Sequence, residues 1–263
     1  MSTVLITGAT SGLGRYVAFA LVRSGHVVLA HGRDPERTGQ LVEELRAHGT
    51  AEGFVADLAS LARVRELGSE VAEAHPELDV LVNNAGVGGG PPGSGRELSA
   101  DGHELRLAVN YLAPVALTRA LLPVLRADTP SRIVNVGSAG QEPLDFADPE
   151  LTRGYSGVSA YCRSKFALAA HTFTLAEELA GSGVSVNVLH PATYMDTGMV
   201  RESGITPWNT VADGASGVLA LATGEVGSGG YFDGTRPARA HEAAYDPRVR
   251  RRLAVVTDQL LTV

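Results

Sequence analysis

Short runs of valine, leucine and isoleucine recur along the chain, and stretches long enough for a helix separate them. The runs are nearly continuous and do not alternate with polar residues, which predicts strands buried on both faces of a parallel sheet. They occupy residues 3–8, 26–32, 52–58, 78–86, 131–138, 184–191 and 229–234. This alternation predicts an α/β fold, a Rossmann-type doubly wound parallel sheet of about seven strands flanked by helices. We expect a single domain over residues 1–263, because neither a linker nor a repeat interrupts the pattern.

Composition and charge exclude several classes of protein. Hydrophobic residues make up 44% of the 263 positions, which is enough for a large core. The net charge of −7 argues against nucleic acid as a partner, because that binding requires a basic face. The basic run at residues 248–253 is interpreted as a solvated helix face, with a recruitment patch as the alternative.

The sequence also bears on compartment and on metals. The single cysteine, Cys162, excludes an internal disulfide and favours a reducing compartment. The first strand lacks the pattern of a signal peptide, and no apolar run reaches the roughly 18 residues of a membrane span. We therefore expect a cytoplasmic protein without a membrane span. The histidines show no metal-ligand spacing, so no metal site is expected, and His190 is taken as structural.

The first predicted strand runs directly into a glycine-rich stretch, TGATSGLG, at residues 7–14. Glycine allows positive φ angles and lets the backbone approach a ligand closely, and the next helix would present its N-terminus to a pyrophosphate. A tight strand-to-helix turn without a ligand is the alternative for such a loop on its own. Its place after the first strand of an α/β pattern favours dinucleotide binding.

This stretch resembles the short-chain dehydrogenase/reductase family, whose members carry T-G-x-x-x-G-x-G at this point and N-N-A-G later, as at residues 83–86 here. The long segment before YCRSK is similar to the retinol-dehydrogenase-like branch. Asp57 matches the aspartate that contacts adenine in the family, with a plain strand-end cap as the alternative. The resemblance implies cofactor contacts from Gly8, Thr10, Ser11, Gly12, Leu13, Gly14, Arg33, Asp57, Leu58, Asn84, Ala85, Gly86, Tyr161, Lys165, Pro191 and Thr193.

The choice between the two nicotinamide cofactors depends on charge at the end of the second strand. An acid there would bind the ribose 2′-hydroxyl, whereas an arginine would accept a 2′-phosphate. Gly32 stands about where NAD-selecting members carry the acid, and Arg33 stands where NADP-using members carry a base. Arg15 adds positive charge nearby, and Asp34 is expected to face solvent. We expect NADP(H), with NAD(H) as the alternative.

Tyr161 and Lys165 stand four residues apart in a predicted helix and therefore share one face. A free tyrosine has a pKa of about 10, roughly 3 units too high for efficient proton transfer at neutral pH. Lowering it by that much requires about 4 kcal/mol. An ammonium roughly 4 Å away supplies about this energy at an effective dielectric constant of about 20. The spacing thus predicts that Lys165 lowers the pKa of Tyr161.

The family resemblance assigns roles to four residues. Tyr161 would be the general acid in carbonyl reduction and the base in alcohol oxidation, and Lys165 would also hold the nicotinamide ribose. Ser138, preceded by Gly137 where the family usually has another serine, would hydrogen-bond the substrate oxygen. Asn110 matches the asparagine that supports a proton relay through water, and a core-facing asparagine at a helix bend is its alternative.

The stretch HPATYMDTG departs from the family pattern, because alanine replaces the usual glycine after Pro191. Thr193 and Thr197 compete for the contact with the nicotinamide amide. Residues from about 193 to 212 are expected to form a substrate loop. Trp208, Met195 and Met199 could form a lid there or merely a covered core patch, and we favour the lid.

The sequence as a whole predicts an NADP(H)-dependent oxidoreductase that transfers a hydride between nicotinamide and a ketone, aldehyde or secondary alcohol. The branch resemblance favours an apolar carbonyl or alcohol substrate. An epimerase or dehydratase that retains its cofactor is one alternative, and a non-catalytic nucleotide-sensing protein is another. Because many family members pair through the helix that holds Tyr161 and the helix before it, a homodimer or homotetramer is expected. Cys162 is expected to serve packing only.

Overall fold

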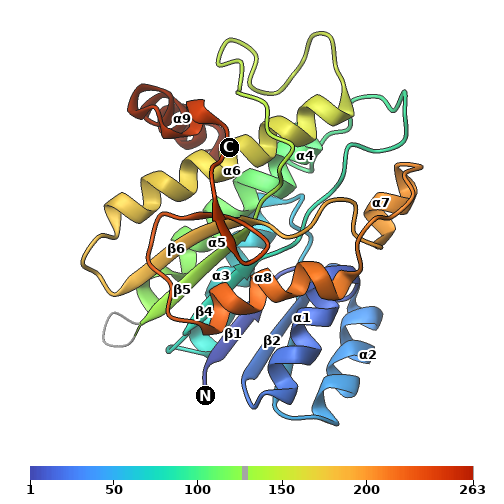
Figure 1. Cartoon of the computed structure of the whole chain (residues 1–263), viewed down its shortest axis with the longest axis vertical. Helices are drawn as coiled ribbons and strands as arrows, with labels where there is room; N and C mark the ends of the chain where they lie inside the picture. The colour runs from blue at the N-terminus through green and yellow to red at the C-terminus, as the bar shows by residue number, and fades with distance from the viewer. Residues whose placement is uncertain (126–129, 263) are drawn as a thin grey trace.

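A computed structural model of the chain describes residues 1–125 and 130–262. One sheet has the strand order β3-β2-β1-β4-β5-β6-β7-β8 (Figure 1). All neighbours from β3 to β7 pair in parallel, and β8 pairs antiparallel with β7. The strands are β1 Thr3–Ile6, β2 Val27–Gly32, β3 Ala51–Val55, β4 Val80–Asn83, β5 Ser131–Val136, β6 Val184–His190, β7 Tyr231–Asp233 and β8 Arg236–Ala238. The seven predicted strands are therefore present, and the doubly wound parallel sheet is confirmed.

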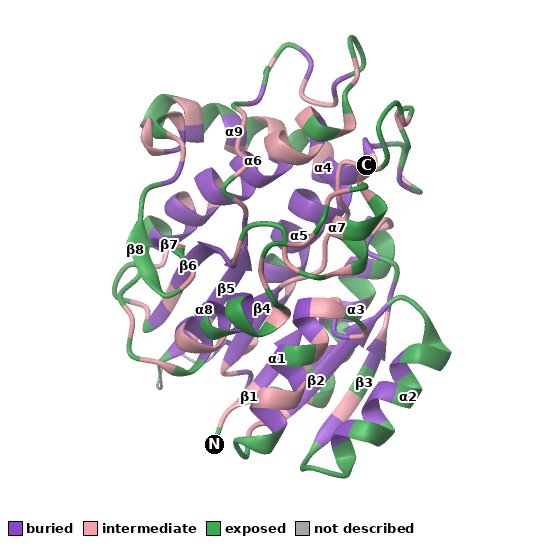
Figure 2. Cartoon of the chain, turned by 45° about the vertical axis from the view of Figure 1, so that its right-hand side comes forward, coloured by how far each residue is buried: buried purple, intermediate pink, exposed green. Residues whose placement is uncertain are grey.

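Helices cover both faces of the sheet. The α-helices are α1 Gly12–Arg23, α2 Pro35–Arg46, α3 Leu61–Ala74, α4 Leu105–Leu107, α5 Ala113–Leu121, α6 Gly157–Glu178, α7 Gly198–Glu202, α8 Val211–Thr223 and α9 Pro247–Leu261. A π-helical turn, η1 Ala108–Leu112, joins α4 to α5, and the 3₁₀ turns are η2 Leu122–Val124 and η3 Glu242–Tyr245. Helices α1, α2 and α8 pack on one face, and α3, α5 and α6 pack on the other (Figures 1 and 2).

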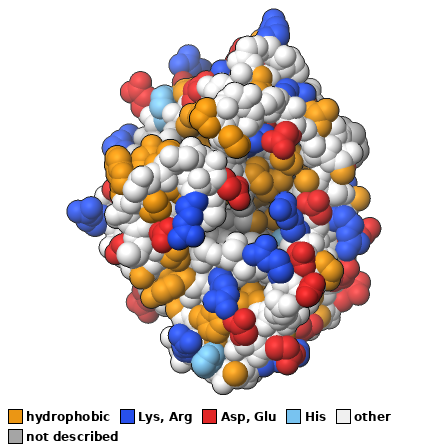
Figure 3. Space-filling model, turned by 90° about the vertical axis from the view of Figure 1, so that its right-hand side faces the viewer, with side chains coloured by type: hydrophobic (Ala, Val, Ile, Leu, Met, Phe, Trp, Pro, Cys, Tyr) orange, Lys and Arg blue, Asp and Glu red, His pale blue; other side chains and the backbone are white. Residues whose placement is uncertain are grey.

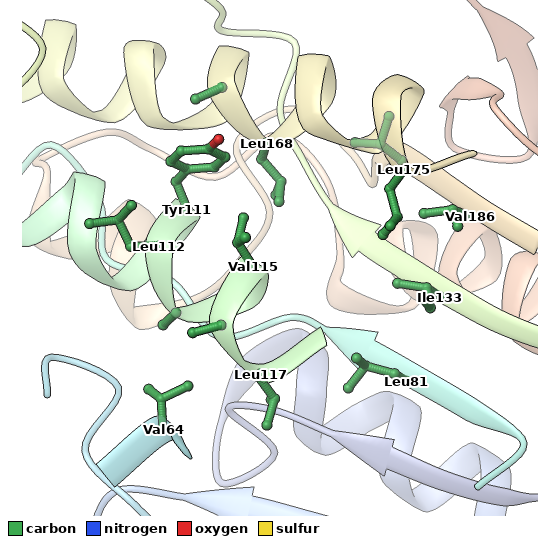
Figure 4. Packing of buried hydrophobic residues seen from close by; sticks show 14 of the residues in the cluster. Val64, Leu81, Tyr111, Leu112, Val115, Leu117, Ile133, Leu168, Leu175 and Val186 are labelled. Carbon is green, nitrogen blue, oxygen red and sulfur yellow. The ribbon is translucent and has the colours of Figure 1, made fainter. Parts of the chain in front are cut away.

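The central strands are buried on both sides, as their unbroken apolar runs predict. Leu81 of β4 and Ile133 of β5 point toward α5 and α6 and meet Val115 and Leu168 there (Figure 4). Val82 and Val134 of the same two strands belong to the second core layer, beneath α1 and α8. Alternate residues of one strand thus serve opposite layers, which fixes the register of the sheet.

The eighth strand, β8, was not predicted. It is a three-residue partner for β7, joined to it by a tight turn in which Gly234 has a φ of +58°. All three of its residues are exposed, so its sequence lacks the apolar run that marks the buried strands. A short, exposed edge strand that contains a proline protects the open edge of β7 from pairing with another chain.

Helix α9 forms an outer layer over α6 (Figures 1 and 2). It also reaches the neighbouring elements, since Thr257 hydrogen-bonds the hydroxyl of Tyr111 and Asp258 pairs with Arg119 of α5 at 2.7 Å. The interpretation of the basic run as fully solvated is wrong for Arg250. This side chain is buried, and its Nη2 lies 2.8 Å from Glu177 Oε1 of α6. The other basic residues of the run are exposed as predicted.

Among the described residues, one helical stretch is long and apolar enough to cross a membrane by those criteria alone. It spans Leu105–Val124, and 72% of its most apolar window is buried inside the fold. The stretch contains η1 and α5, which form the centre of the packing between the sheet and α6. Its apolar character is therefore accounted for by the core.

Candidate active site

The predicted site residues gather at the carboxyl ends of β1, β4, β5 and β6. Strand β1 pairs with β2 on one side and with β4 on the other, so the chain reverses its direction of winding between β1 and β4. Open α/β sheets bind ligands in the crevice at such a point. The face that carries α2 and α7 is hollowed at its centre, and basic side chains, which are arginines at this surface, gather around the hollow (Figure 3).

The glycine loop between β1 and α1 has the geometry that its sequence predicts. Gly8 and Gly12 have φ angles of +67° and +50°, which favour glycine. Gly14 packs so closely that a built Cβ would lie 2.3 Å from the Gly8 carbonyl oxygen. Ser11 stands at the N-cap of α1 and makes no capping hydrogen bond with any residue that the structure describes. The first N–H groups of α1 are therefore open to an anion, as a pyrophosphate requires.

Thr7, which was not among the predicted site residues, ties the glycine loop to the loop after β4. Its hydroxyl oxygen accepts hydrogen bonds from the N–H groups of Asn84 and Ala85, both at 3.0 Å. The Asn84 amide returns a hydrogen bond of 2.8 Å to the Thr7 carbonyl. Asn84 therefore stabilises the glycine loop by hydrogen bonds, and its backbone extends from the end of β4 into the crevice.

His31 is a second residue that the sequence interpretation missed. It is buried near the end of β2, where its Nδ1 accepts a hydrogen bond from the Gly8 N–H at 3.3 Å. Its Nε2 lies 3.0 Å from the Ala56 carbonyl, so the neutral ring with hydrogen on Nε2 satisfies both contacts. Burial lowers the pKa of His31, which favours this neutral form. The only signal in the sequence is a histidine inside an apolar run.

We expect Gly14→Ala to damage the glycine loop. The new Cβ would meet the Gly8 carbonyl oxygen at 2.3 Å and the Asn84 amide nitrogen at 2.5 Å, so the backbone must shift. A cost of about 1–3 kcal/mol in the free energy of unfolding follows, with a loss of nicotinamide-cofactor affinity of roughly tenfold or more. Thermal unfolding and fluorescence titration with NADPH measure the two effects.

Gly39→Ala is the matched control for this change. Gly39 lies inside α2, and a built Cβ would meet no described atom within 4 Å. Alanine there should stabilise the helix by about 0.5–1 kcal/mol and leave cofactor affinity unchanged. Equal cofactor affinity in the two variants would contradict the role given to Gly14.

The end of β2 carries the residues on which the choice between NADP and NAD depends, and that choice stays a prediction. A Cβ built on Gly32 would lie 2.4 Å from Thr38 Oγ1 and 2.5 Å from Thr10 Cγ2, so an acidic side chain has no room at this position. Arg33 is exposed and makes no ion pair or hydrogen bond with the described side chains. Asp34 caps α2 by accepting a hydrogen bond of 3.0 Å from the Arg37 N–H, so its carboxylate is engaged and not simply solvated.

Other predicted cofactor residues differ in their surroundings. Arg15 pairs with Glu44 of α2, which partly neutralises the charge expected of it. Asp57 is exposed after β3 and accepts a hydrogen bond from the Ala59 N–H at 2.9 Å, and Leu58 beside it is buried. The cap that was given as the alternative for Asp57 is therefore formed, and the exposed carboxylate still has acceptor capacity.

Ser138, Tyr161 and Lys165 meet beyond the end of β5. Lys165 Nζ lies 5.8 Å from the centre of the Tyr161 ring, so both side chains lie on the same side of α6, as the four-residue spacing predicts. Ser138 hydrogen-bonds the Tyr161 side chain. Lys165 is buried, and its ammonium donates a hydrogen bond of 2.7 Å to the Val136 carbonyl of β5.

The protonation of this cluster differs from the expectation. Burial raises the pKa of Tyr161 above its ordinary value, and the hydrogen bond with Ser138 offsets part of that rise. Burial lowers the pKa of Lys165 to about 8. The expected lowering of the pKa of Tyr161 is thus wrong for the chain by itself. A nearby ammonium favours the phenolate, but burying a phenolate is costly and raises the pKa.

Asn110 lies in the π-helical turn η1, and π-bulges often mark functional sites. Its side chain is completely buried and makes two hydrogen bonds with the backbone of Val87. Its Oδ1 accepts a hydrogen bond from the Val87 N–H at 2.8 Å, and its Nδ2 donates one to the Val87 carbonyl at 3.0 Å. A Cβ built on Gly86 would lie 3.1 Å from Asn110 Oδ1 and 3.6 Å from Lys165 Nζ. Glycine at 86 thus leaves Asn110 and Lys165 facing a shared space. The core-facing interpretation of Asn110 is confirmed, and its part in a proton relay stays a prediction.

The segment after β6 lies across the crevice. Pro191 is buried, and the hydroxyl of Thr193 lies 3.0 Å from His190 Nε2. Thr197 caps α7, and its Cγ2 would lie 3.2 Å from a Cβ built on Gly12 of the glycine loop. Of the two threonines, Thr197 is therefore the one beside the helix N-terminus that would hold a pyrophosphate.

The aromatic residues of this segment stay at the surface. The ring of Trp208 is 71% exposed and stands edge-on to Tyr194, with 4.9 Å between ring centres. Met195 packs against Gly214 of α8 and is partly covered. A covered core patch is therefore the wrong description for Trp208. Among the described residues, no group of histidine, cysteine and acidic side chains could hold a metal ion.

Comparison with known proteins agrees with this geometry. The family model of the short chain dehydrogenases matches residues 2–207. Retinol dehydrogenase 13 from Homo sapiens is 34% identical over 277 residues, covering 95% of this chain and 82% of that protein.

Two solved structures show the same fold. An uncharacterised protein from Mycobacterium Paratuberculosis has a TM-score of 0.84 and 30% identity, covering 100% of this chain and 94% of the other. A short chain dehydrogenase from Burkholderia cenocepacia in complex with NADP has a TM-score of 0.71 and 30% identity, covering 88% and 94%. The chain therefore belongs to the short-chain dehydrogenase family, on its retinol-dehydrogenase-like branch, and is an NAD(P)-dependent oxidoreductase.

Proposed function

We propose that this chain is an NADP(H)-dependent oxidoreductase that interconverts a ketone or aldehyde and the corresponding alcohol, with Tyr161 as general acid and base. One observation carries the proposal. Tyr161, Ser138 and Lys165 converge beside a glycine loop whose helix N-terminus is open to a pyrophosphate. A cluster that served only packing would not need a buried ammonium there, because burying a charge is costly.

The residues present fit a dinucleotide. Gly8, Gly12 and Gly14, with the backbone of Thr10, Ser11 and Leu13, would hold the pyrophosphate. Asp57, Leu58, Asn84, Ala85 and Gly86 would line the adenosine side and the path to the nicotinamide. Pro191 and one of the two threonines would border the nicotinamide, and Thr197 lies against Gly12 of the loop that would hold the pyrophosphate. The bound nicotinamide would supply the hydride in reduction and take it in oxidation.

The chain's own residues would manage the proton. Ser138 holds the substrate oxygen and Tyr161 donates its phenolic proton to that oxygen as the carbonyl carbon is reduced. The raised pKa of Tyr161 keeps this proton in place until the substrate oxygen gains charge. Lys165, whose pKa burial lowers to about 8, can return a proton near neutral pH, and Asn110 faces the same space.

We expect Arg33→Ala to weaken the binding of NADPH far more than that of NADH. Arg33 is exposed beside Gly32 and without a described ion-pair partner, so its guanidinium is free for a 2′-phosphate. Loss of a charge-assisted hydrogen bond of about 1.5–3 kcal/mol corresponds to a rise of roughly 10- to 150-fold in the Kd of NADPH. The NADP complex of the Burkholderia cenocepacia relative supports this preference.

Arg236→Ala is the control, because it removes the same charge from the exposed strand β8 at the far edge of the sheet. It should leave the Kd of both cofactors unchanged. Tighter binding of NADH than of NADPH by the wild-type protein would overturn the cofactor proposal. The alternative, NAD(H), would then apply.

The substrate class is tested by NADPH oxidation, with NADH in parallel, across a panel of apolar ketones and aldehydes. Residues from about 193 to 212 would cover the substrate, with Met199, Tyr194 and Trp208 as an apolar surface. Turnover without net consumption of NADPH would identify an epimerase or dehydratase. Cofactor binding without any turnover would identify a nucleotide-sensing protein.

Three further points belong to the proposal. Residues 1–263 would form one domain, since all eight strands share a sheet. A cytoplasmic location follows from the composition and stays a prediction.

Pairing into a homodimer or homotetramer through α6 and α5 also stays a prediction. Helix α9 covers part of the surface that such pairing would use, so light scattering of the intact protein is the decisive measurement.

A further inference from the structure

We infer that Arg106 is a positioning residue. It fixes the backbone at Gly88, and α7 packs against this backbone over the crevice. The inference rests on the proposed function only for its kinetic consequence. Arg106 does not touch the reacting groups, and its role is to hold the loop that borders them.

Arg106 is almost completely buried although it carries a full charge. Its side chain is 4% exposed, and its Nε donates a hydrogen bond of 3.0 Å to the Gly88 carbonyl. Its Nη2 lies 2.7 Å from Glu97 Oε2, and its Nη1 lies 3.6 Å from Glu104 Oε1. A buried guanidinium is retained at considerable cost in desolvation, so contacts of this number and geometry point to a positional role.

Arg106 acts together with Asn110, which lies one helical turn further along the chain. Asn110 binds both the N–H and the carbonyl of Val87, and Arg106 binds the carbonyl of Gly88. Two consecutive residues of the loop after β4 are thus held from one helical face. Arg106 also reaches the next turn of the loop, because a Cβ built on Gly90 would lie 3.0 Å from its Nη2.

The opposite side of the held loop supports two other elements. A Cβ built on Gly88 would lie 2.8 Å from Met199 Cγ of α7, so the methionine already occupies that space. A Cβ built on Gly157 would lie 1.9 Å from the Gly89 carbonyl oxygen. The loop therefore touches α7 through Gly88 and the first residue of the Tyr161 helix through Gly89.

A second connection links Arg106 to the Tyr161 helix. Glu104, its buried ion-pair partner, accepts a hydrogen bond of 3.1 Å from the hydroxyl of Tyr155. Burial and the neighbouring Glu104 raise the pKa of Tyr155 to about 12, so this hydroxyl stays a donor. Ser156, the next residue, caps α6. Arg106 thus joins the loop, α7 and the start of α6 in one arrangement.

The test compares Arg106→Met with the wild type in two assays. The KM of the carbonyl substrate should rise about tenfold while kcat stays within about twofold, because the wall of the substrate site moves and the proton-transfer groups do not. Trypsin cleavage after Arg201, an exposed arginine of α7, should accelerate about fivefold or more without any ligand, because α7 loses its support. Arg106→Lys should give intermediate values, since it retains one donor.

Arg250→Met is the matched control. Arg250 is also a buried arginine paired with one carboxylate, Glu177, but it lies on α9, outside the crevice. It should lower stability without changing the KM or the cleavage after Arg201. Equal effects of Arg106→Met and Arg250→Met on these two measurements would overturn the inference.

Gly88→Ala tests the same contact from the other side if Arg106→Met does not fold. The new methyl group displaces Met199 while Arg106 stays in place, so the KM and the cleavage rate should both rise. Unchanged values would overturn the inference as well. The cleavage assay needs neither cofactor nor turnover, so failure of the proposed reductase activity would appear separately, as absent NADPH oxidation by the wild type.

Discussion

Tyr161→Phe is expected to lower turnover by about 10²–10⁴-fold, because it removes the general acid and keeps the ring. The hydroxyl of Tyr161 is hydrogen-bonded to Ser138, and Lys165 Nζ lies 5.8 Å from the ring centre. Phenylalanine fills the same volume, so the crevice and the glycine loop should be preserved. Steady-state NADPH oxidation measures turnover, and fluorescence titration should show a Kd of NADPH within about threefold of the wild type.

Tyr111→Phe is the matched control for this experiment. This variant also loses a buried hydroxyl. In the wild type, the hydroxyl of Tyr111 lies in the core and is hydrogen-bonded to Thr257 of α9. We expect a loss of about 1 kcal/mol in the free energy of unfolding and unchanged turnover. If Tyr161→Phe turned over as fast as Tyr111→Phe, the mechanism proposed for Tyr161 would be wrong.

Lys165→Met is expected to abolish turnover and to change how stability depends on pH. Burial lowers the pKa of Lys165 from 10.5 to about 8, so the folded chain is penalised for carrying this ammonium. The penalty is complete below pH 8, where Lys165 is charged in both the folded and the unfolded chain. It disappears as the pH rises toward 10.5, because the folded chain has then released the proton.

The difference in free energy of unfolding between wild type and Lys165→Met isolates this effect. It should shift by about 2–3 kcal/mol in favour of the wild type between roughly pH 7 and pH 10. Other ionisable groups cancel in the difference. The hydrogen bond to the Val136 carbonyl is lost in the variant at every pH and adds only a constant. Urea unfolding at a series of pH values is the measurement, and a difference independent of pH would contradict the lowered pKa.

Much of the fold was predictable because buried parallel strands need continuous apolar runs. The run at 184–191 predicts β6, and the structure places that strand at Val184–His190. Strand β8 carries no such signal, because its residues are exposed and it exists only by pairing with β7. Arg250 was misjudged for a related reason. A basic run looks uniform in sequence, whereas the helical turn places one of its members against Glu177.

The candidate site was predictable where a local rule governs it. Helical spacing alone places Tyr161 and Lys165 on one side of α6, and positive φ angles explain Gly8 and Gly12. The direction of the pKa shift at Tyr161 was not predictable, because it depends on burial by residues distant in the sequence. The motifs predict that the chain belongs to the short-chain dehydrogenase family, and the comparisons confirm this prediction.

Residues that act through the backbone of another segment were missed. Arg106 and His31 hold the Gly88 carbonyl and the Gly8 N–H, and neither partner lies within one helical turn of them in sequence. All residues have a backbone, so the sequence does not show which backbone group a side chain will bind. Arg106 offered one weak signal, since it stands four positions before Asn110 in a segment otherwise rich in apolar residues.

Helix α9 has a consequence for how the chain is made. Every element that α9 contacts leaves the ribosome before α9 does. The outer side of α6 is therefore exposed to solvent until α9 emerges. The sites that later receive Leu253 and Leu261 are then bare apolar surface on an otherwise assembled protein. Such surface is prone to aggregation. A premature stop codon before Pro247 would therefore yield a chain with a complete sheet that depends on chaperones to stay in solution.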